Sequence, residues 1–262
     1  MILHNNNITD SENFSEKTFE SGLSIYEVIR VLNGKPIFLQ DNLLRLDNSI
    51  KKSNLDLDIT NLHIQDKLDK VIRLENIQEG NLKYVLHITE NKIDEYIYQI
   101  PHSYPTQENY DNGITTISCM AMRENPEVKY VNNELRILTN QLIKEKQAYE
   151  VLLVDNEGYV TEGSRSNVFF IKDQTLFTAG TRYVLPGTSR KRVLDICKEL
   201  HITVIEDRVA YDKLKEYSAA FITGTSPLIL PIRKIDNLTF DPHNELLKKL
   251  MKSYFSLLSR TF

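Results

Sequence analysis

Lys129 is the residue with the clearest potential for covalent chemistry. It opens the run Lys-Tyr-Val-Asn, just before a segment with helical spacing. A lysine in such a place can be an ordinary solvated side chain. It can also be an amine nucleophile that forms a Schiff base with a carbonyl group, provided that it loses its proton near neutral pH. Partial burial and a neighbouring positive charge would both favour the unprotonated amine.

A second candidate is Glu162, in the polar run Thr-Glu-Gly-Ser-Arg-Ser-Asn at residues 161–167. We expect this run to be a turn between two strands, because such residues gather in turns. Turn geometry could equally hold the carboxylate at the edge of a site. A carboxylate beside a pyridine nitrogen keeps that nitrogen protonated, and the ring can then act as an electron sink for a carbanion.

Three further segments could bind a phosphate group. Thr188 and Ser189 begin a predicted helix, where they can be simple N-caps or can join the backbone N–H groups that bind an anion. Thr225 lies in the run Thr-Gly-Thr-Ser-Pro, which alone is typical of a turn that ends a strand. Arg45 lies on an earlier predicted helix and is either an exposed arginine or a bidentate phosphate ligand.

The elements that must position these residues alternate between strands and helices. Apolar runs and alternation predict strands, and apolar residues at helical spacing predict helices. The predicted strands cover residues 24–32, 35–39, 82–89, 96–100, 114–118, 150–154, 166–172 and 176–179, with two more near Ile202 and Ala219. The predicted helices cover residues 41–52, 60–74, 133–148, 189–200 and 244–259. The fold class is therefore mixed α/β, without a regular βαβ array or a glycine-rich dinucleotide fingerprint.

A polar, proline-containing stretch at residues 101–113 is the best candidate for a domain boundary. We expect residues 1–108 to form an N-terminal α/β domain, and residues 109–262 to form a C-terminal α/β domain that carries Lys129.

Charge and hydropathy exclude some partners. The net charge of the 262 residues is −4 with both signs mixed, so there is no electrostatic reason to expect nucleic acid or an anionic membrane as a partner. The N-terminus lacks the features of a signal peptide, and no apolar run is long enough to span a bilayer. We expect a soluble, cytoplasmic protein.

Taken in order, these segments resemble the class IV aminotransferases, the fold-type IV group of pyridoxal 5'-phosphate (PLP) enzymes. That group includes branched-chain and D-amino-acid aminotransferases and aminodeoxychorismate lyase. The resemblance runs from about Gly22 to Asp236 and is most specific in YEVLLVDNEGYVTEGSRSNVFFIKDQTLFTA. It also includes YEVIRVLNGKPIFLQDNLLRLDNSI, VKYVNNELR, LPGTSRKRVL and FITGTSPLILPI.

The resemblance implies a role for each candidate residue. Lys129 would form the Schiff base with PLP, and Glu162 would face the pyridine nitrogen. The phosphate would be held by Arg45, Thr188, Ser189 and Thr225. The implied fold is D-amino-acid-aminotransferase-like, with PLP between two α/β domains and no metal. The implied assembly is a homodimer whose active site borrows residues from the partner.

The chain departs from the family where the substrate is chosen. D-amino-acid aminotransferases carry an arginine where this chain has Glu90, and a glutamate cannot hold a substrate carboxylate. Arg30 and Arg123 are the nearest substitutes by sequence. Arg30 could instead point to solvent, and Arg123 could instead pair with Glu124 or Glu127.

The predicted activity is transfer of an amino group between an amino acid and a 2-oxo acid. The runner-up is a PLP lyase of the 4-amino-4-deoxychorismate type, although Tyr26, a candidate substrate contact, and Glu27 fit the aminotransferase pattern better. The alternative of another class is a non-catalytic PLP-binding protein, against which the intact Lys129 and Glu162 argue.

Overall fold

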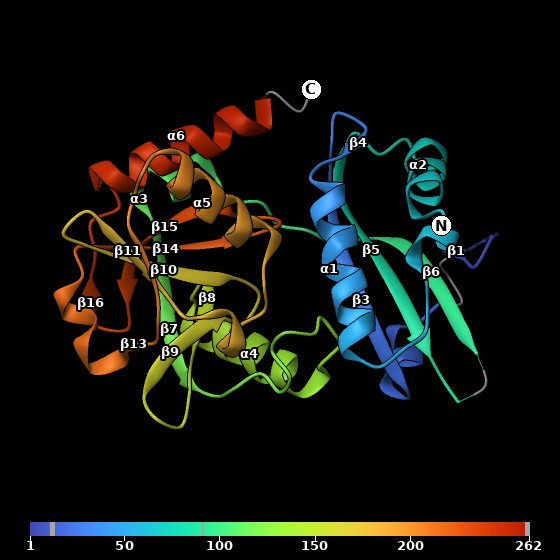
Figure 1. Ribbon diagram of the computed structural model, residues 1–262, viewed down its shortest axis with the longest axis horizontal. Helices are drawn as coiled ribbons and strands as arrows, with labels where there is room; N and C mark the ends of the chain where they lie inside the picture. The colour runs from blue at the N-terminus through green and yellow to red at the C-terminus, as the bar shows by residue number, and fades with distance from the viewer. Residues whose placement is uncertain (11–13, 91, 260–262) are drawn as a thin grey trace. The chain divides into compact units, whose positions relative to one another are not determined.

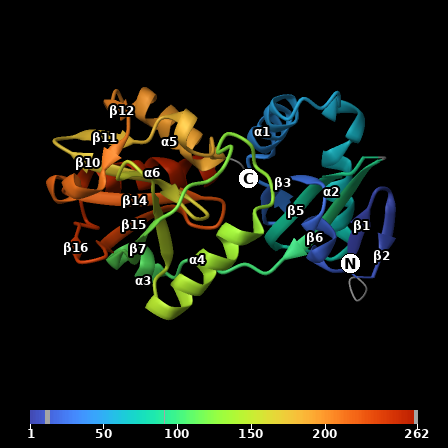
Figure 2. The same cartoon turned by 90° about the horizontal axis from the view of Figure 1, so that it is seen from below.

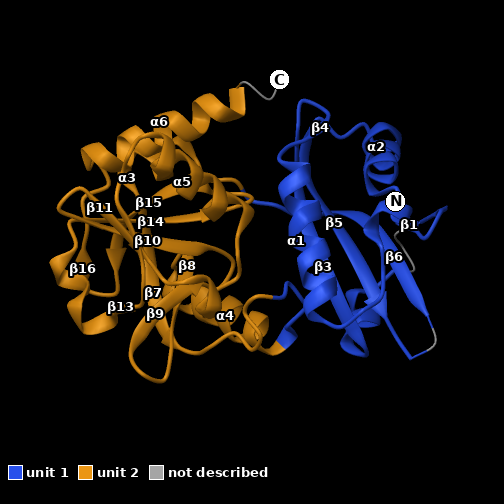
Figure 3. Ribbon diagram, viewed as in Figure 1, with its two compact units in different colours: residues 1–103, 128–133, 262 blue, residues 104–127, 134–261 orange. Residues whose placement is uncertain are grey.

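The computed structural model describes residues 1–10, 14–90 and 92–259, and the chain forms two compact units (Figure 3). Unit 1 comprises Met1–Ser103 and Val128–Asn133, and unit 2 comprises Tyr104–Glu127 and Glu134–Thr261. The first division thus falls after Ser103 rather than after residue 108. Lys129 lies in unit 1 rather than in the unit formed by most of residues 109–262, because its segment pairs with a strand of unit 1.

Unit 1 is built on a six-stranded antiparallel sheet with the order β2-β1-β6-β5-β3-β4 (Figure 1). Its strands are β1 (Ile2–His4), β2 (Asn7–Thr9), β3 (Leu23–Leu32), β4 (Lys35–Pro36), β5 (Glu79–Ile88) and β6 (Ile93–Ile100). β3 pairs with β5 along its whole length. Because side chains alternate along a strand, each strand contributes to both faces of the sheet.

The two faces of this sheet have different covers. The helices α1 (Leu39–Lys52) and α2 (Ile64–Leu74) bury apolar residues against one face, in a core that includes Ile25, Leu46 and Leu68 (Figure 2). The opposite face carries a cluster of aromatic side chains beside the short 3-10 helix η2 (Glu16–Glu20). Charged and aromatic residues on this second face are therefore kept apart from the aliphatic core.

Unit 2 is built on a ten-stranded mixed sheet with the order β12-β11-β10-β14-β15-β7-β8-β9-β13, and β16 pairs with β15. Its strands are β7 (Ile114–Met120), β8 (Glu150–Val154), β9 (Tyr159–Gly163), β10 (Asn167–Lys172), β11 (Thr175–Thr178), β12 (Val204–Glu206), β13 (Val209–Ala210), β14 (Ala219–Gly224), β15 (Leu228–Ile235) and β16 (Leu238–Thr239). Its helices are α3 (Gln107–Asn112), α4 (Asn133–Lys146), α5 (Thr188–Glu199) and α6 (Glu245–Ser259), with 3-10 turns η4 (Thr181–Tyr183) and η5 (Tyr211–Glu216). α5 packs against β14 and α6 (Figure 1). The mixed α/β class predicted from the sequence is confirmed.

Two sequence predictions about these elements are wrong. The helix expected over residues 60–74 is a 3-10 turn, η3 (Ile59–Leu62), followed by α2, because His63 between them adopts the left-handed conformation with φ 47°. Thr161 and Glu162 lie in β9 rather than in a turn. Polar residues can occupy this buried strand because they have partners there, such as Leu153 O, which accepts a hydrogen bond from Thr161 Oγ1.

The strand β15 was not expected from the sequence. It contains Pro231 and is paired on both sides, with β14 and with β7. Proline lacks the N–H that a sheet ladder uses and is rare in central strands, so it is a poor strand signal. The register between β15 and β7 shifts between Ile232 and Lys234, next to the proline.

Candidate active site

Lys129 is fixed against the edge of β3 in unit 1. Its carbonyl accepts a hydrogen bond from Tyr26 N at 3.0 Å, and Val131 N donates to Ser24 O at 3.0 Å. The side chain is half-buried, and Nζ lies 4.6 Å from the centroid of the Tyr26 ring. The sheet edge therefore holds the backbone of Lys129, and the ring of Tyr26 flanks its amine.

Arg45 is buried on α1 rather than exposed to solvent. Its Nε donates to Glu27 Oε1 at 2.8 Å and its Nη2 donates to Glu27 Oε2 at 2.5 Å. Asn42 Nδ2 donates to the same carboxylate at 2.8 Å. Burial alone would lower the pKa of Arg45, but the charge and hydrogen bonds of Glu27 raise it, so the guanidinium stays charged. The bidentate pair also fixes the direction of the guanidinium plane.

The partners of Arg45 were not identified as site residues from the sequence. Asn42 precedes Arg45 by three positions on α1, and this spacing places two side chains on one face of a helix. That spacing was the available signal. The contact with Glu27 joins a strand to a helix and has no local signature.

Glu162 and Arg123 form a buried ion pair within unit 2. Arg123 Nε donates to Glu162 Oε1 at 2.8 Å, and Arg123 Nη2 donates to Ser164 O at 3.3 Å. The exposed fractions of the two side chains are 10% for Arg123 and 2% for Glu162. Leu185 N donates to Glu162 Oε2 at 3.1 Å. Both carboxylate oxygens are thus held by N–H donors, which stabilise the charged form of a carboxylate.

The same network leads to the N-terminus of α5. Asn167 Nδ2 donates to Leu185 O at 2.8 Å, and the helix begins at Thr188. The N-cap is Gly187, with no side-chain cap hydrogen bond, so neither Thr188 nor Ser189 is the N-cap. Free N–H groups and the helix dipole make such a terminus suitable for an anion.

Ser189 and Thr225 lie close to one another in the chain's fold. Ser189 Oγ donates to Gly224 O at 3.0 Å, and Thr225 follows Gly224 in the turn between β14 and β15. Next to this turn, Thr223 Oγ1 is buried and has no hydrogen-bond partner among the residues described. A buried hydroxyl without a partner is unusual and is expected where a polar ligand completes the site.

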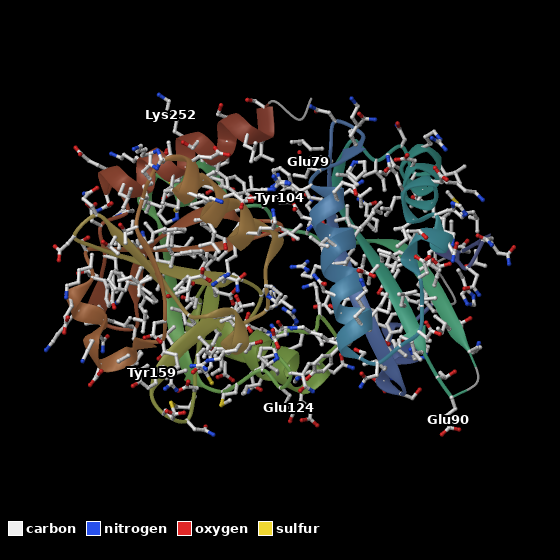
Figure 4. All side chains as sticks on the ribbon, viewed as in Figure 1. Glu79, Glu90, Tyr104, Glu124, Tyr159 and Lys252 are labelled. Atoms are coloured by element: carbon white, nitrogen blue, oxygen red, sulfur yellow. The ribbon has the colours of Figure 1, made fainter. Side chains whose placement is uncertain are left out.

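The predicted substrate contacts have other partners or positions. Arg30 Nη2 donates to Glu79 Oε1 at 3.2 Å, across β3 and β5. Arg123 contacts Glu162, a partner that the sequence did not suggest. Glu90 is exposed at the tip of the β5–β6 hairpin (Figure 4). Arg30 and Arg123 thus each pair with a carboxylate of the chain itself, and their role toward a substrate stays a prediction.

Neither a membrane-spanning helix nor a metal-binding cluster is found in residues 1–10, 14–90 and 92–259. No helix in this part of the chain is long and apolar enough to cross a membrane. No group of three or more His, Cys, Asp or Glu side chains there is arranged to hold a metal ion.

Known proteins with related sequences and structures point to one family. The model of the amino-transferase class IV family matches residues 24–235. A D-alanine aminotransferase from Bacillus licheniformis is 28% identical over 238 residues, covering 86% of this chain and 83% of that protein. The branched-chain amino acid aminotransferase from Escherichia coli matches with a TM-score of 0.81 at 23% identity, covering 98% of this chain and 93% of that one. A putative 4-amino-4-deoxychorismate lyase from Legionella pneumophila matches with a TM-score of 0.81 at 21% identity, covering 96% and 97%.

The chain belongs to the class IV aminotransferases, as the resemblance of its motifs predicted. The two solved structures establish the fold of the family, and the expected fold type is confirmed. Members of this family use PLP as their cofactor.

The residues of this chain fit both ends of PLP, the pyridine nitrogen and the phosphate. The buried Glu162 carboxylate suits the pyridine nitrogen, and the N-terminus of α5 with Thr223 Oγ1 suits the phosphate. A Cβ on Gly187 would lie 2.1 Å from Asn167 Oδ1, so this position requires the close backbone approach that glycine allows.

Proposed function

We propose that the protein transfers an amino group between an amino acid and a 2-oxo acid, with Lys129 as the residue that binds PLP. The observation that carries this proposal is the anchoring of the buried Glu162 carboxylate. The anchors are the guanidinium of Arg123 and the N–H of Leu185, which lies just ahead of the N-terminus of α5. The segment that leads into the proposed phosphate site therefore also contacts the carboxylate that would accept from the ring nitrogen.

Each residue then has a definite task. The cofactor, when bound, supplies an electron sink for the bond that breaks at the substrate Cα. The amine of Lys129 would take the proton from the substrate Cα as a general base and deliver it, as a general acid, to the carbon of the cofactor that receives the amino group. Glu162 would keep the ring nitrogen protonated. Arg45, Thr188, Ser189 and Thr225 would hold the phosphate and so fix the orientation of the ring.

Arg123 has the role of a positioning residue in this proposal. Its guanidinium donates to Glu162 and to Ser164 O, so its charge is directed at the carboxylate that would face the ring nitrogen. A guanidinium at 2.8 Å favours the ionised carboxylate. This role takes the place of the substrate clamp that we considered for Arg123.

We also propose a homodimer, because large apolar side chains are exposed on unit 2. The side chain of Ile137 on α4 is 66% exposed, and those of Met120 and Met122 are 64% and 53% exposed. Large apolar side chains that are exposed to this extent are candidates for contact with a second copy of the chain. The cytoplasmic location stays a prediction from the sequence.

A half-reaction tests the proposed function. The purified protein is saturated with PLP and mixed with single amino acids, and the cofactor spectrum is followed until the amino form of the cofactor appears. In parallel, pyruvate release from 4-amino-4-deoxychorismate is measured. Conversion by amino acids without pyruvate release supports the aminotransferase. Pyruvate release alone would identify the lyase, and neither signal with PLP bound would identify a non-catalytic binding protein.

A further inference from the structure

Two donors on the aromatic face of unit 1 converge on one carboxylate oxygen. Lys83 Nζ donates to Glu16 Oε1 at 2.7 Å, and Tyr98 OH donates to the same oxygen at 2.6 Å. Lys83 and Tyr98 lie directly opposite each other on β5 and β6. Burial and the Glu16 carboxylate raise the pKa of Tyr98, so its hydroxyl remains a donor. Lys83 and Tyr98 therefore define a position for a carboxylate oxygen.

Aromatic rings surround the ammonium group of Lys83. Its Nζ lies 5.7 Å from the ring centroid of Phe19, 5.2 Å from that of Tyr26 and 5.7 Å from that of Tyr98. The Lys83 side chain is only 10% exposed. Rings that exclude water lower the local dielectric constant and strengthen the attraction between an ammonium ion and a carboxylate.

One of these rings also flanks the amine of Lys129. Lys129 Nζ lies 4.6 Å from the centroid of Tyr26, whose backbone N–H donates to Lys129 O at 3.0 Å. The carboxylate position at Lys83 and the reactive amine thus share Tyr26 as a common wall. An amino acid presents its nitrogen and its carboxylate on one carbon atom, so a site for it needs an amine-reacting group and a carboxylate-binding group close together.

The carboxylate that Lys83 holds is open to water. Glu16 lies on the five-residue η2, and its side chain is 57% exposed. A similar network on the other face of the sheet differs in this respect: Lys67 pairs with Glu95, which also accepts a hydrogen bond from Tyr84 OH at 2.7 Å. The Glu95 side chain is 11% exposed. The Glu16 carboxylate thus already contacts water, whereas the Glu95 carboxylate is largely shielded from it.

We propose that Lys83 and Tyr98 bind a carboxylate of the substrate, and that Glu16 holds this position until the substrate displaces it. The proposal rests on the proposed aminotransferase function and provides the carboxylate clamp that Glu90 cannot supply. Exchange of one carboxylate for another keeps the buried Lys83 charge paired, so no unpaired buried charge is created. A carboxylate-free amine cannot make this exchange.

The first test compares donors that differ only in the carboxylate. Half-reaction rates of the PLP-loaded protein are measured with D-alanine, L-alanine and ethylamine for the wild type, Lys83→Met and Tyr98→Phe. Loss of a charge-assisted hydrogen bond should lower kcat/KM for the better alanine enantiomer by about 10- to 150-fold in Lys83→Met, mainly through KM, and should leave ethylamine almost unchanged. Tyr98→Phe should act in the same direction, by a smaller factor, and it keeps the test valid if Lys83→Met does not fold.

The matched control is Lys67→Met, which removes the lysine of the similar network on the other face. Lys67→Met should change kcat/KM for alanine and for ethylamine by the same factor, because it should affect only the stability of the protein. Equal losses for alanine and ethylamine in Lys83→Met would overturn the proposal, because the Lys83–Glu16 pair would then be only structural.

The second test measures carboxylate binding without turnover. The thermal shift caused by propionate, with propionamide as the uncharged reference, is measured for the wild type, Lys83→Met and Glu16→Gln. Lys83→Met should abolish the propionate-specific shift, and Glu16→Gln should enlarge it because the internal competitor is gone. An unchanged shift in both variants contradicts the proposal. If the wild type reacts with no donor, the aminotransferase function fails, while propionate still decides the site at Lys83.

Discussion

At the scale of single residues, Glu162 carries the clearest expectation. Glu162→Gln keeps the size of the side chain but removes the charge that Arg123 and Leu185 N now hold. We expect PLP to remain bound and the half-reaction to slow by at least about 100-fold, as for other losses of preorganised charge. Glu157→Gln, at a side chain 68% exposed in the same unit, is the control. Near wild-type rates for Glu162→Gln would show that this carboxylate only supports the strand.

Lys129 should be the residue that becomes labelled when the PLP-loaded protein is reduced with borohydride. A half-buried amine held at the edge of β3 is the nucleophile that the motif predicts. Peptide mapping locates the adduct, and Lys129→Ala is the control that should give no label. A label on another lysine in the wild type, at saturating PLP, would contradict the assignment.

Arg45 should contribute to stability as well as to PLP affinity. Arg45→Ala leaves Glu27 buried without its bidentate partner, and breaking such a pair typically costs about 3–5 kcal/mol of unfolding free energy. Loss of the proposed phosphate contact should weaken PLP binding by about 10- to 150-fold. Chemical denaturation and PLP titration measure the two effects.

The double variant Arg45→Met with Glu27→Leu separates these two effects. Apolar residues of similar volume often replace a buried ion pair at little cost, so most of the stability should return. The PLP affinity should stay low. If affinity returns with stability, Arg45 is a structural residue and not a phosphate ligand.

At the scale of elements, the N-terminus of α5 depends on the absence of a side chain at Gly187. Gly187→Ala would place a Cβ 2.1 Å from Asn167 Oδ1, so either the N-terminal turn or the Asn167 side chain, which donates to Leu185 O, must move. We expect weaker PLP binding and a lower Tm. Gly187→Ala combined with Asn167→Ala removes the clash and should restore part of the Tm. Gly180→Ala, where the nearest atom would be at 3.3 Å, is the control, and an equal effect there would refute the argument.

The elements that the sequence predicted well are those with a local signal. β3, β5 and α1 have clear periodicity, and the structure places them within a few residues of the predicted bounds. β9 was predicted as a turn because its polar residues were given no partners, and those partners, such as Arg123 for Glu162, come from distant segments. β15 was missed because Pro231 is a local signal against a strand, which the surrounding sheet overrides.

The candidate site shows the same division. The motifs around Lys129, Glu162 and α5 could be found because they are contiguous in the sequence. The pairing of Lys83 with Glu16 could not be found, because these residues are 67 positions apart and meet only when β5 lies beside η2. The sequence around a single charged residue does not show which distant residue it will contact in the fold.

At the scale of the whole molecule, α4 should contribute to association. It buries only Thr139 among the residues described, while Ile137 and Leu138 are 66% and 43% exposed. We expect light scattering to give the mass of a dimer, and Ile137→Glu to shift the protein toward the monomer. Lys144→Glu, at the polar end of the same helix, is the control for a change of charge. A monomeric wild type would refute the homodimer.

Because Val128–Asn133 belongs to unit 1, cleavage of the chain between the two units would not separate them cleanly. The polypeptide leaves unit 1 after Ser103 and returns for this one short segment, which pairs with β3. A protease nick after Ser103 would therefore not release two autonomous fragments. The larger fragment would contain Lys129, whereas β3, the strand with which its segment pairs, would be in the smaller fragment. Separately produced halves should each lack a fixed nucleophile, and mixing them should reconstitute it, as in split-protein complementation.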